Sequence, residues 1–300
     1  MKNYNDVLIK LLKEGNRVDD TTELINQCLE LPVDKLFTSK IRLISPYYLV
    51  GELMFCLANS NSLEFISHYS KFWKNISDDG ETVRSAYFWQ ARYGHGFDQV
   101  RDVVDKLKRN KNSRQAIIHL HHAHNSVTKD EICTLTLQFM IRNDELIMIV
   151  NMRSNDIILG LPYDHAMFLL LGNMIAEQLG IKLRKYYHNV GSLHKYDRHK
   201  INLNKKDEPC EYSIEFQSEF FKNIPGLVYL EKMIRQEKLE LQALIAIVEC
   251  FEDSLSRTFG MILLMHNKDM ETKKMIFNQL SNVCQQGLTQ LLSDYENFGG

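Results

Sequence analysis

The sequence has little proline, almost no net charge and no long apolar run. Five of its 300 residues are proline, and 36 Lys and Arg against 38 Asp and Glu leave a formal net charge of -2. This balance argues against a non-specific binder of nucleic acid or of a membrane surface. The most apolar stretches, 166–176 and 243–248, are far shorter than the roughly 18 to 20 residues that cross a bilayer. The amphipathic N-terminal stretch lacks the apolar segment of a secretory signal, so we expect a cytoplasmic protein.

Cysteine and histidine are present, but not in the patterns that indicate disulfides or metal sites. The six cysteines are scattered without a CxxC pair, and a chain of this size does not need disulfides. Most of them are expected to be small buried hydrophobic residues. His119, His121, His122 and His124 have no cysteine or carboxylate at ligand spacing, and strand alternation would place them on opposite faces. We therefore predict no metal site.

Hydrophobic periodicity divides the first part of the chain into helices and strands. Apolar residues at helical spacing predict helices over 4–15, 46–58 and 164–179. Runs rich in β-branched and aromatic residues predict strands over 116–120, 133–141 and 145–152. A turn at Arg142-Asn143-Asp144 joins the last two strands, and Arg17 is expected in a polar loop. The helix over 164–179 is apolar nearly all round, which places it at the centre of the fold.

The last hundred residues differ in character from the rest. A polar stretch begins near residue 200, a short strand is expected over 212–216, and helical patterns follow over 228–266 and 271–295. We therefore predict a core of residues 1–205 and a divergent, mainly helical region of residues 206–300 packed on it.

Polar residues interrupt otherwise apolar segments at a few places. Glu52 is embedded among apolar residues of the 46–58 helix, where a buried carboxylate needs a partner. Clusters also occur at Ser113-Arg114-Gln115, at Cys133 with Gln138, and at 153–156 leading to 160–164. An isolated Arg and Asp at a strand end are usually an exposed ion pair of little energetic value. Together, however, these clusters form a specific pattern.

The pattern resembles the thymidylate synthase family in residues and in spacing. The matching motifs are Gly15-Asn16-Arg17, Glu52-Leu53-Met54-Phe55-Cys56, Trp73, Tyr87-Phe88-Trp89-Gln90, Ser113-Arg114, Cys133-Thr134-Leu135-Thr136-Leu137-Gln138, Arg153-Ser154-Asn155-Asp156, Gly160-Leu161-Pro162-Tyr163-Asp164 and His194-Lys195-Tyr196. The separations are 20 positions from Cys133 to Arg153, 11 onward to Asp164 and 30 onward to His194. The resemblance covers about residues 4 to 200.

The resemblance implies an α/β fold, with a mixed sheet, flanking helices and a helical C-terminal extension, that forms a homodimer of sheets packed back to back. It also implies that Cys133 adds to carbon 6 of a pyrimidine nucleotide. This addition turns carbon 5 into a nucleophile, and covalent catalysis of this kind divides one difficult step into easier ones. The thiolate needs a lowered pKa, which the guanidinium of Arg153 is placed to supply. Glu52 matches the general acid/base of the family, and Tyr87 joins the catalytic set.

Four residues match the phosphate clamp of the family: Arg17, Arg153, Ser154, and Arg114 reaching across the dimer. Arginines suit a phosphate dianion because their N–H groups bind it in pairs. The family has a second arginine after Arg114, whereas this chain has Gln115. His194 and Tyr196 match the pair that holds the sugar hydroxyl.

The resemblance also implies a folate site. Trp73, Asp156 and Gly160 match residues that face the pterin of 5,10-methylenetetrahydrofolate, the one-carbon donor.

Asp164 stands where the uracil-using members of the family have asparagine. An amide offers a donor and an acceptor, which match N3–H and O4 of uracil, whereas a carboxylate only accepts. Facing cytosine, a carboxylate accepts from the 4-amino group and shares a proton with ring nitrogen 3. Asp164 therefore favours a cytidine 5'-monophosphate, CMP or dCMP, as in the hydroxymethylases of the family. A protonated Asp164 could imitate an amide, which leaves uracil open.

The final residues, Glu296-Asn297-Phe298-Gly299-Gly300, do not resemble the closing tail of the methylating enzymes. Water would then reach the reaction intermediate, and the expected product carries a hydroxymethyl group. One alternative is a divergent thymidylate synthase that methylates dUMP. Another is a catalytically silent member whose C-terminal region binds a partner, although a silent fold has no physical need for the residues named above.

Overall fold

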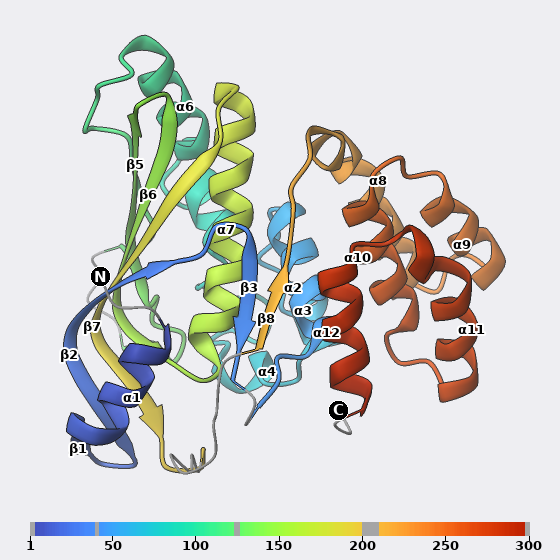
Figure 1. The fold of residues 1–300 in the computed structure, drawn as a ribbon, viewed down its shortest axis with the longest axis horizontal. Helices are drawn as coiled ribbons and strands as arrows, with labels where there is room; N and C mark the ends of the chain where they lie inside the picture. Colours follow the sequence, from blue (N-terminus) through green and yellow to red (C-terminus); the bar gives the residue numbers. More distant parts are fainter. Residues whose placement is uncertain (1–3, 40–41, 123–126, 200–209, 298–300) are drawn as a thin grey trace.

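The fold is built on a six-stranded mixed sheet with helices packed on one side (Figure 1). The computed structural model describes residues 4–39, 42–122, 127–199 and 210–297. The strand order is β1-β2-β7-β6-β5-β4, in which only the β6–β7 pair is parallel. These strands are β1 (Asn16–Val18), β2 (Thr21–Leu31), β4 (Ile117–His119), β5 (Thr134–Arg142), β6 (Glu145–Asp156) and β7 (Leu183–Tyr196). The predicted α/β class is confirmed.

Two further strands, the helices α1 to α7 and the turn η1 surround this sheet. The two strands, β3 (Lys35–Thr38) and β8 (Cys210–Ser213), form a small antiparallel sheet of their own. The helices are α1 (Tyr4–Glu14), α2 (Pro46–Leu57), α3 (Leu63–Tyr69), α4 (Trp73–Ile76), α5 (Tyr87–Trp89), the π-helical turn η1 (Gln90–Gly94), α6 (Gln99–Arg109) and α7 (Gly160–Leu179).

The hairpin of β5 and β6 forms as the sequence predicts. Asn143 and Asp144 at its turn both have positive φ, 53° and 57°. This is the conformation that two-residue hairpins require, and asparagine and aspartate adopt it more readily than most residues. β6 then runs on to Asp156, and the chain enters α7 at Gly160. The motif residues 153–164 therefore lie at one end of the sheet, where a strand passes into the central helix.

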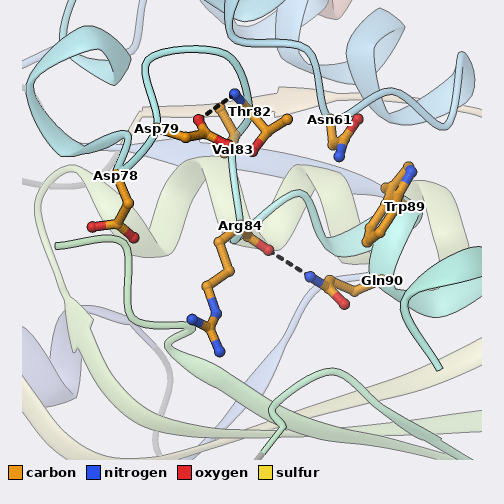
Figure 2. A pocket seen from close by; sticks show the side chains of 8 residues that line it. All are labelled: Asn61, Asp78, Asp79, Thr82, Val83, Arg84, Trp89 and Gln90. Atoms are coloured by element: carbon orange, nitrogen blue, oxygen red, sulfur yellow. Dashed lines mark hydrogen bonds between the residues drawn. The ribbon is translucent and has the colours of Figure 1, made fainter. Parts of the chain in front are cut away.

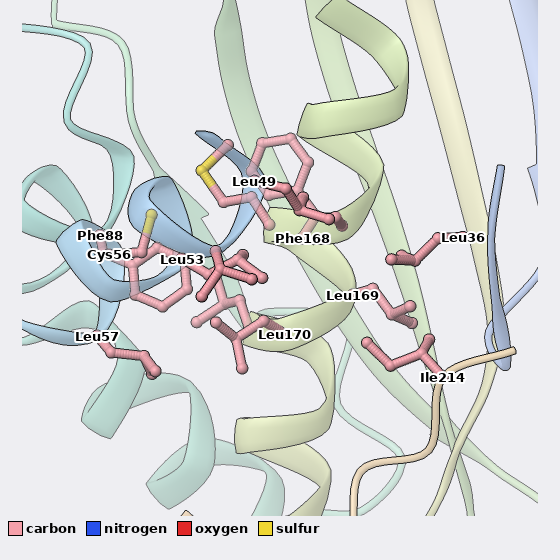
Figure 3. Packing of buried hydrophobic residues seen from close by; sticks show 14 of the residues in the cluster. Leu36, Leu49, Leu53, Cys56, Leu57, Phe88, Phe168, Leu169, Leu170 and Ile214 are labelled. Carbon is pink, nitrogen blue, oxygen red and sulfur yellow. The ribbon is translucent and has the colours of Figure 1, made fainter. Parts of the chain in front are cut away.

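The core lies between α7 and the elements on either side of it (Figure 3). Leu49 and Leu53 of α2 face Phe168 and Leu170 of α7, and all four side chains are buried. Burying an apolar side chain of this size contributes about 1.5–3 kcal/mol. This packing fixes α2 against α7, and with it the relative positions of the site residues that each helix carries.

Four strands, β1, β2, β3 and β7, were not expected from the sequence, and Arg17 lies elsewhere than predicted. β2 and β7 pair along ten positions, from Thr21–Tyr196 to Leu31–Tyr186. Their half-buried positions carry polar and charged residues, which hides the apolar alternation that marks a strand. Arg17, expected in a loop, lies in β1 and pairs with Thr22. β1 is therefore one edge of the sheet.

The C-terminal region forms a bundle of shorter helices than the periodicity suggested. These are α8 (Ser218–Arg235), α9 (Leu241–Glu249), α10 (Ser254–Met265), α11 (Met270–Leu280), the 3-10 turn η2 (Ser281–Val283) and α12 (Gln286–Asn297). Glu237 has positive φ, 51°, and divides the pattern over 228–266, while Asn267, with φ of 58°, lies between the two patterns. The pattern over 271–295 is interrupted at η2. Asp253 and Asp269 then cap the N-termini of α10 and α11 through their carboxylates. The predicted boundary between residues 205 and 206 lies outside the described residues.

The C-terminal helices pack against α2 on the side away from the sheet (Figure 1). The Tyr47 hydroxyl donates to Glu296 of α12, and Lys273 of α11 forms a salt bridge with Glu296 at 2.8 Å. Nearby, Tyr69 of α3 donates to the buried Glu231 of α8 at 3.0 Å. The region therefore supports the helix that carries Glu52. Within the described residues, no helix is both long and apolar enough to span a membrane.

Candidate active site

Cys133 and Arg153 meet where β5 begins. Cys133 directly precedes β5, and the backbone N–H of Arg153 donates to its carbonyl at 2.9 Å. The Nη2 of Arg153 lies 3.5 Å from the Cys133 Sγ. Its guanidinium also donates to the carbonyls of Glu131 at 2.8 Å and Ile132 at 3.0 Å, which fixes its orientation. The two residues that the sequence placed together in the reaction are in contact.

The pKa of the Cys133 thiol is set mainly by burial. Burial raises this pKa above its ordinary value of 9.0, and Arg153 lowers it, as the sequence analysis expected. The nearby carboxyl groups of Asp164, Asp130 and Glu131 raise it again. The net shift is therefore upward and not downward as expected, because one guanidinium does not outweigh the loss of solvent around the thiol.

Glu52 projects from α2 into a buried hydrogen-bonded group. The Tyr48 hydroxyl, one helical turn earlier, donates to the Glu52 Oε1 at 2.7 Å. The Trp73 Nε1–H in turn donates to the Tyr48 hydroxyl at 3.1 Å. Burial raises the pKa of Glu52 to about 8, which the hydrogen bond from Tyr48 partly offsets, and the neighbouring Asp164 raises it further. A carboxyl group with this pKa holds a proton at neutral pH and can both release and accept one.

Asp164 lies in the first turns of α7, next to the end of β6. The Asn155 Nδ2 donates to the Asp164 Oδ2 at 2.7 Å. Burial raises the pKa of Asp164 to about 7, although this hydrogen bond works in the opposite direction, and Asp156 adds a further increase. Asp164 and Glu52 are therefore two neighbouring carboxyl groups that are partly protonated near neutral pH, which is typical of acid–base sites.

Several predicted residues line one small cavity, of about 70 Å³. Its walls are formed by Glu52, Phe55, Cys56, Trp73, Ser85, Ala86, Tyr87, Asp164 and Met167. Tyr87 stacks on Phe168 of α7, with ring centroids 5.7 Å apart. Burial raises the pKa of Tyr87, and the nearby Asp164 and Cys133 add to the increase. Ligand pockets usually measure about 300–1,000 Å³, so this cavity is too small for a whole nucleotide. It is lined by the two carboxyl groups and Tyr87, and Cys133 is not among its lining residues.

A larger cavity of about 330 Å³ lies beside the segment that carries Tyr87 (Figure 2). Part of its polar lining is engaged within the protein. The Asp79 carboxylate accepts hydrogen bonds from the backbone N–H groups of Glu81 and Thr82 at 2.8 and 2.7 Å, and the Gln90 Nε2 donates to the Arg84 carbonyl at 2.8 Å. These contacts shape a turn and its connection to α5, and we assign no ligand to this cavity.

Ser154, His194 and Tyr196, matched to the phosphate and the sugar, lie together at the end of β6 and β7. Asp156 is in register with His194, and the Ser154 Oγ lies 3.5 Å from the His194 Nδ1. His194 and Tyr196 contact each other edge to face, with centroids 5.2 Å apart. The Arg198 guanidinium covers the Tyr196 ring at 4.0 Å, a contact that sequence analysis did not identify.

Arg17 and Arg114 lie at opposite edges of the sheet. Arg17 is exposed on β1 and forms a salt bridge with Asp197 at 2.7 Å. Arg114 is exposed just before β4, where its carbonyl accepts from the Gln138 Nε2 at 2.9 Å. β1 and β4 are separated by five strand spacings of about 4.8 Å, or roughly 24 Å. One chain therefore cannot bring both guanidinium groups to the same phosphate.

Trp73, Asp156 and Gly160 differ in how they fit a pterin. Trp73 lines the small cavity, and its N–H is used by Tyr48, which leaves the indole face for stacking. One oxygen of Asp156 accepts the Ile158 N–H at 2.8 Å, and a carboxylate suits the N–H donors of a pterin edge. An aromatic face and a carboxylate fit a flat ring that donates hydrogen bonds. Gly160 has a structural reason of its own, because a Cβ there would lie 2.9 Å from the Asn155 Nδ2.

Three contributors to the site were not identified from the sequence. Tyr48 holds Glu52, while Tyr186 and His188 of β7 connect to Asn155 in the interior. Tyr48 could have been found because it lies one helical turn from Glu52. Tyr186 and His188 gave no such signal, since β7 itself was not predicted. Of the histidines considered as metal ligands, His124 lies outside the described residues.

Comparison with known proteins gives the same assignment as the motifs. The model of the family "Thymidylate synthase" matches residues 2–219, well over half of the chain. The chain belongs to the thymidylate synthase family. The family match includes all the predicted site residues, from Arg17 to Tyr196, and ends inside α8. Most of the C-terminal helices lie outside it.

Two relatives show how far the similarity extends. The chain is 30% identical over 214 residues to a deoxyuridylate hydroxymethyltransferase of Bacillus phage SP01, covering 64% of this chain and 56% of that protein. It is 27% identical over 223 residues to the thymidylate synthase of Buchnera aphidicola subsp. Acyrthosiphon pisum (strain APS), covering 69% and 83%. The chain thus spans little more than half the length of the phage enzyme.

Proposed function

We propose that this member of the thymidylate synthase family catalyses folate-dependent hydroxymethylation at carbon 5 of a cytidine 5'-monophosphate, CMP or dCMP. The single observation that carries the choice of base is the half-buried carboxyl group of Asp164, hydrogen-bonded to Asn155 at 2.7 Å. Burial brings its pKa to about 7, so near neutral pH it can offer both an acceptor oxygen and a proton. Cytosine needs this pair, because its 4-amino group donates and ring nitrogen 3 accepts.

Cys133 is the proposed nucleophile. Its Sγ forms a bond to carbon 6, and the electron pair of the carbon 5–carbon 6 double bond moves toward ring nitrogen 3. Asp164 gives its proton to that nitrogen, which makes carbon 5 nucleophilic without leaving a charge on the ring. Arg153 contacts the Sγ at 3.5 Å and favours the thiolate over the thiol. When bound, 5,10-methylenetetrahydrofolate supplies the one-carbon unit at the oxidation level of formaldehyde.

Glu52 is the proposed general acid/base, and the hydrogen bond from Tyr48 holds it in place. It accepts the proton lost from carbon 5 and orients the water whose hydroxyl becomes part of the product. Expulsion of the Cys133 thiolate, with return of the proton from ring nitrogen 3 to Asp164, then restores the ring. Trp73 would stack against the pterin and Asp156 would accept its N–H groups, which suits the indole face and the carboxylate described above. Gly160 is proposed to let the pterin approach the start of α7.

We further propose that the enzyme works as a homodimer in which each phosphate is bound by residues of both chains. Arg17, Arg153 and Ser154 would come from one chain and Arg114 from the partner subunit, while His194 and Tyr196 hold the sugar. Two observations support this: Arg17 and Arg114 lie at opposite sheet edges, and the sheet face away from α7 carries half-buried apolar side chains. These are Met140, Ile147, Ile149 and Tyr187.

A second candidate is the same reaction on a uracil nucleotide. It is favoured by the similarity to the phage deoxyuridylate hydroxymethyltransferase. Against it stands Asp164, which as a carboxylate would face the O4 oxygen of uracil with an oxygen of its own. A mismatch of this kind costs roughly 1–3 kcal/mol when buried.

Mass spectrometry separates these candidates. The protein is incubated with 5,10-methylenetetrahydrofolate and separately with CMP, dCMP and dUMP. Gain of CH2O on a cytosine nucleotide is the expected result, and the faster substrate identifies the sugar. Gain of CH2O on dUMP alone supports the second candidate, and gain of CH2 on dUMP with formation of dihydrofolate supports a thymidylate synthase. No product with any substrate supports a silent, partner-binding protein. Each of these last three outcomes overturns the proposal.

A further inference from the structure

Behind Asp164, a chain of buried hydrogen bonds runs into the interior of the sheet. The Asn155 Nδ2 donates to the Asp164 Oδ2 at 2.7 Å, and the Asn155 Oδ1 lies 3.1 Å from the His188 Nε2. The His188 Nδ1 lies 2.9 Å from the Tyr186 hydroxyl. Tyr186 and His188 are fully buried and Asn155 is 5% exposed. The mechanism above uses none of these three side chains.

The direction of every hydrogen bond in this chain follows from donor and acceptor chemistry. Since the Asn155 Oδ1 can only accept, the His188 Nε2 must carry a proton. Burial lowers the pKa of His188 to about 3, so the ring is neutral and has one N–H. The Nδ1 is then an acceptor, and the Tyr186 hydroxyl donates to it. All the donors point toward Asp164.

We propose that Tyr186, His188 and Asn155 are positioning residues that orient the carboxyl group of Asp164, hold its Oδ2 as an acceptor and leave its proton on Oδ1. An N–H already directed at Oδ2 opposes a proton on that oxygen. Among the residues that the structure describes, no donor is directed at Oδ1, and Asp164 shares with Glu52 and Tyr87 the cavity where the base is expected. The proton that Asp164 exchanges with its substrate therefore has one fixed position.

Gly160 provides independent support for this arrangement. A Cβ at Gly160 would lie 2.9 Å from the Asn155 Nδ2 and 3.6 Å from the Asp164 Oδ2. The start of α7 thus passes the hydrogen bond between Asn155 and Asp164 so closely that only glycine leaves room for it. The buried Asn155 amide and the glycine at the start of α7 therefore both lie next to the Asp164 Oδ2.

This inference rests on the proposed function for its consequence. With cytosine bound, the proton on Oδ1 faces ring nitrogen 3, and Oδ2 accepts from the 4-amino group. With uracil in the same pose, that proton would face N3–H, and Oδ2 would face O4. Uracil would fit only if the proton moved to Oδ2, where the Asn155 N–H opposes it. The hydrogen-bonded chain of Tyr186, His188 and Asn155 therefore prevents a protonated Asp164 from imitating an amide.

Base selectivity tests the proposal through three variants. Asn155→Leu removes the donor to Oδ2, His188→Phe removes the donor to Asn155, and His188→Gln keeps an N–H at that place. In Asn155→Leu and His188→Phe, the ratio of kcat/KM for the cytosine nucleotide to that for dUMP is expected to fall about tenfold or more. His188→Gln is expected to stay within about threefold of the parent. Tyr212→Phe is the control. It removes the hydroxyl of another buried tyrosine, which donates to Asp294, and it should leave the ratio unchanged.

A purely structural role gives a different result. Loss of packing would lower kcat/KM for both nucleotides alike, so a folded Asn155→Leu protein with an unchanged ratio overturns the proposal. Failure of His188→Gln to restore the ratio lost in His188→Phe overturns the role of the histidine. The fraction of folded protein is measured by thermal unfolding for each variant.

Nitrogen-15 NMR of labelled histidine tests the chain without any turnover. The His188 signal, identified by its loss in His188→Gln, is expected to be the neutral Nε2–H tautomer at pH 7. The Nδ1–H tautomer overturns the inference, because the Asn155 amide would then face the other way, and a charged ring overturns it because the Tyr186 hydroxyl could no longer donate to Nδ1. If the parent protein proves to act on uracil, the proposed function fails while the tautomer still reports on the positioning chain.

Discussion

Glu52 of α2 and Asp164 of α7 face the same small cavity, and burial raises the pKa of both carboxyl groups. The pKa of Glu52 is raised to about 8 and that of Asp164 to about 7. Because α2 and α7 are locked together by their apolar faces, the two carboxyl groups cannot separate to lower their repulsion. They stay close by remaining partly protonated, which is how the fold prepares them for proton transfer.

The raised pKa of Glu52 predicts a contribution to stability that falls as pH rises. Between the ordinary value of 4.5 and about 8, the folded protein holds a proton that the unfolded chain has lost. The stabilisation is therefore complete below pH 4.5 and is lost as pH rises through 8, by on the order of 4 kcal/mol. Urea unfolding at pH 5, 6, 7 and 8 measures it. Relative to the parent, Glu52→Gln is expected to lack this contribution. Asp164 and the histidines His165, His188 and His266 act alike on both profiles, and the histidines, whose pKa values burial lowers, give a slope of the opposite sign below pH 6.5.

The matched control is Glu64→Gln, at a glutamate whose side chain is 88% exposed. It should keep the slope of the parent protein. Equal slopes in the parent and in Glu52→Gln would mean that Glu52 is ionised in the folded protein, and the proposed acid/base role would lose its basis.

Burial of Cys133 predicts slow alkylation of the free protein. Only the thiolate reacts with iodoacetamide, and burial keeps the pKa of this thiol above its ordinary value. At pH 7, Cys133 is expected to react about tenfold or more slowly than the exposed Cys28. Arg153→Gln should slow the reaction of Cys133 further, because its guanidinium favours the thiolate. Peptide mass spectrometry over time measures both sites, and faster labelling of Cys133 than of Cys28 would contradict the prediction.

Asp164→Asn is expected to lower turnover of the cytosine nucleotide about tenfold or more, because an amide cannot give a proton to ring nitrogen 3. Activity on dUMP should rise more in the double variant Asp164→Asn/Asn155→Leu than in the single one. With Asn155 present, its N–H holds the new amide oxygen at the Oδ2 position, which turns the amide N–H toward N3–H of uracil. Steady-state kinetics on both nucleotides measures the two variants, and equal dUMP activity in them would contradict this coupling.

Gly160→Ala is expected to disturb the hydrogen bond between Asn155 and Asp164. The new Cβ would lie 2.9 Å from the Asn155 Nδ2, and overpacking of this kind costs typically 1–3 kcal/mol. The midpoint temperature of thermal unfolding and kcat/KM should both decrease. The control is Gly226→Ala in α8, where the nearest atom to a Cβ is the Phe251 ring at 3.0 Å and no site residue is near. Full activity of Gly160→Ala would show that the amide has room to move.

Motifs predicted the chemistry of the site better than its architecture. The spacing of Cys133 and Arg153 placed them together, and they are 3.5 Å apart in the structure. The supporting residues Tyr186 and His188 could not be found, because they lie in a strand with polar residues on its half-buried face. Such a strand is recognised only from its neighbours, which the sequence alone does not specify.

The predicted helices were right where apolar periodicity is regular and wrong in length where it is interrupted by backbone geometry. The predicted helix over 164–179 is the C-terminal part of α7, which begins four residues earlier at Gly160. The pattern over 228–266 is divided at Glu237, a non-glycine residue with positive φ. Nothing in local composition marks such a residue, since tertiary packing imposes its conformation.

The opposite positions of Arg17 and Arg114 predict that two inactive variants restore each other when mixed. A homodimer of Cys133→Ser lacks the nucleophile, and one of Arg114→Ala lacks a phosphate ligand in both sites. A mixed dimer contains one site with both defects and one intact site, provided that Arg114 acts across the interface. Random pairing of equal amounts then gives about a quarter of the parent activity. The two variants are unfolded together, refolded and assayed, with each refolded alone as the control. If Arg114 acted within its own chain, each mixed dimer would hold two defective sites, and mixing would restore nothing.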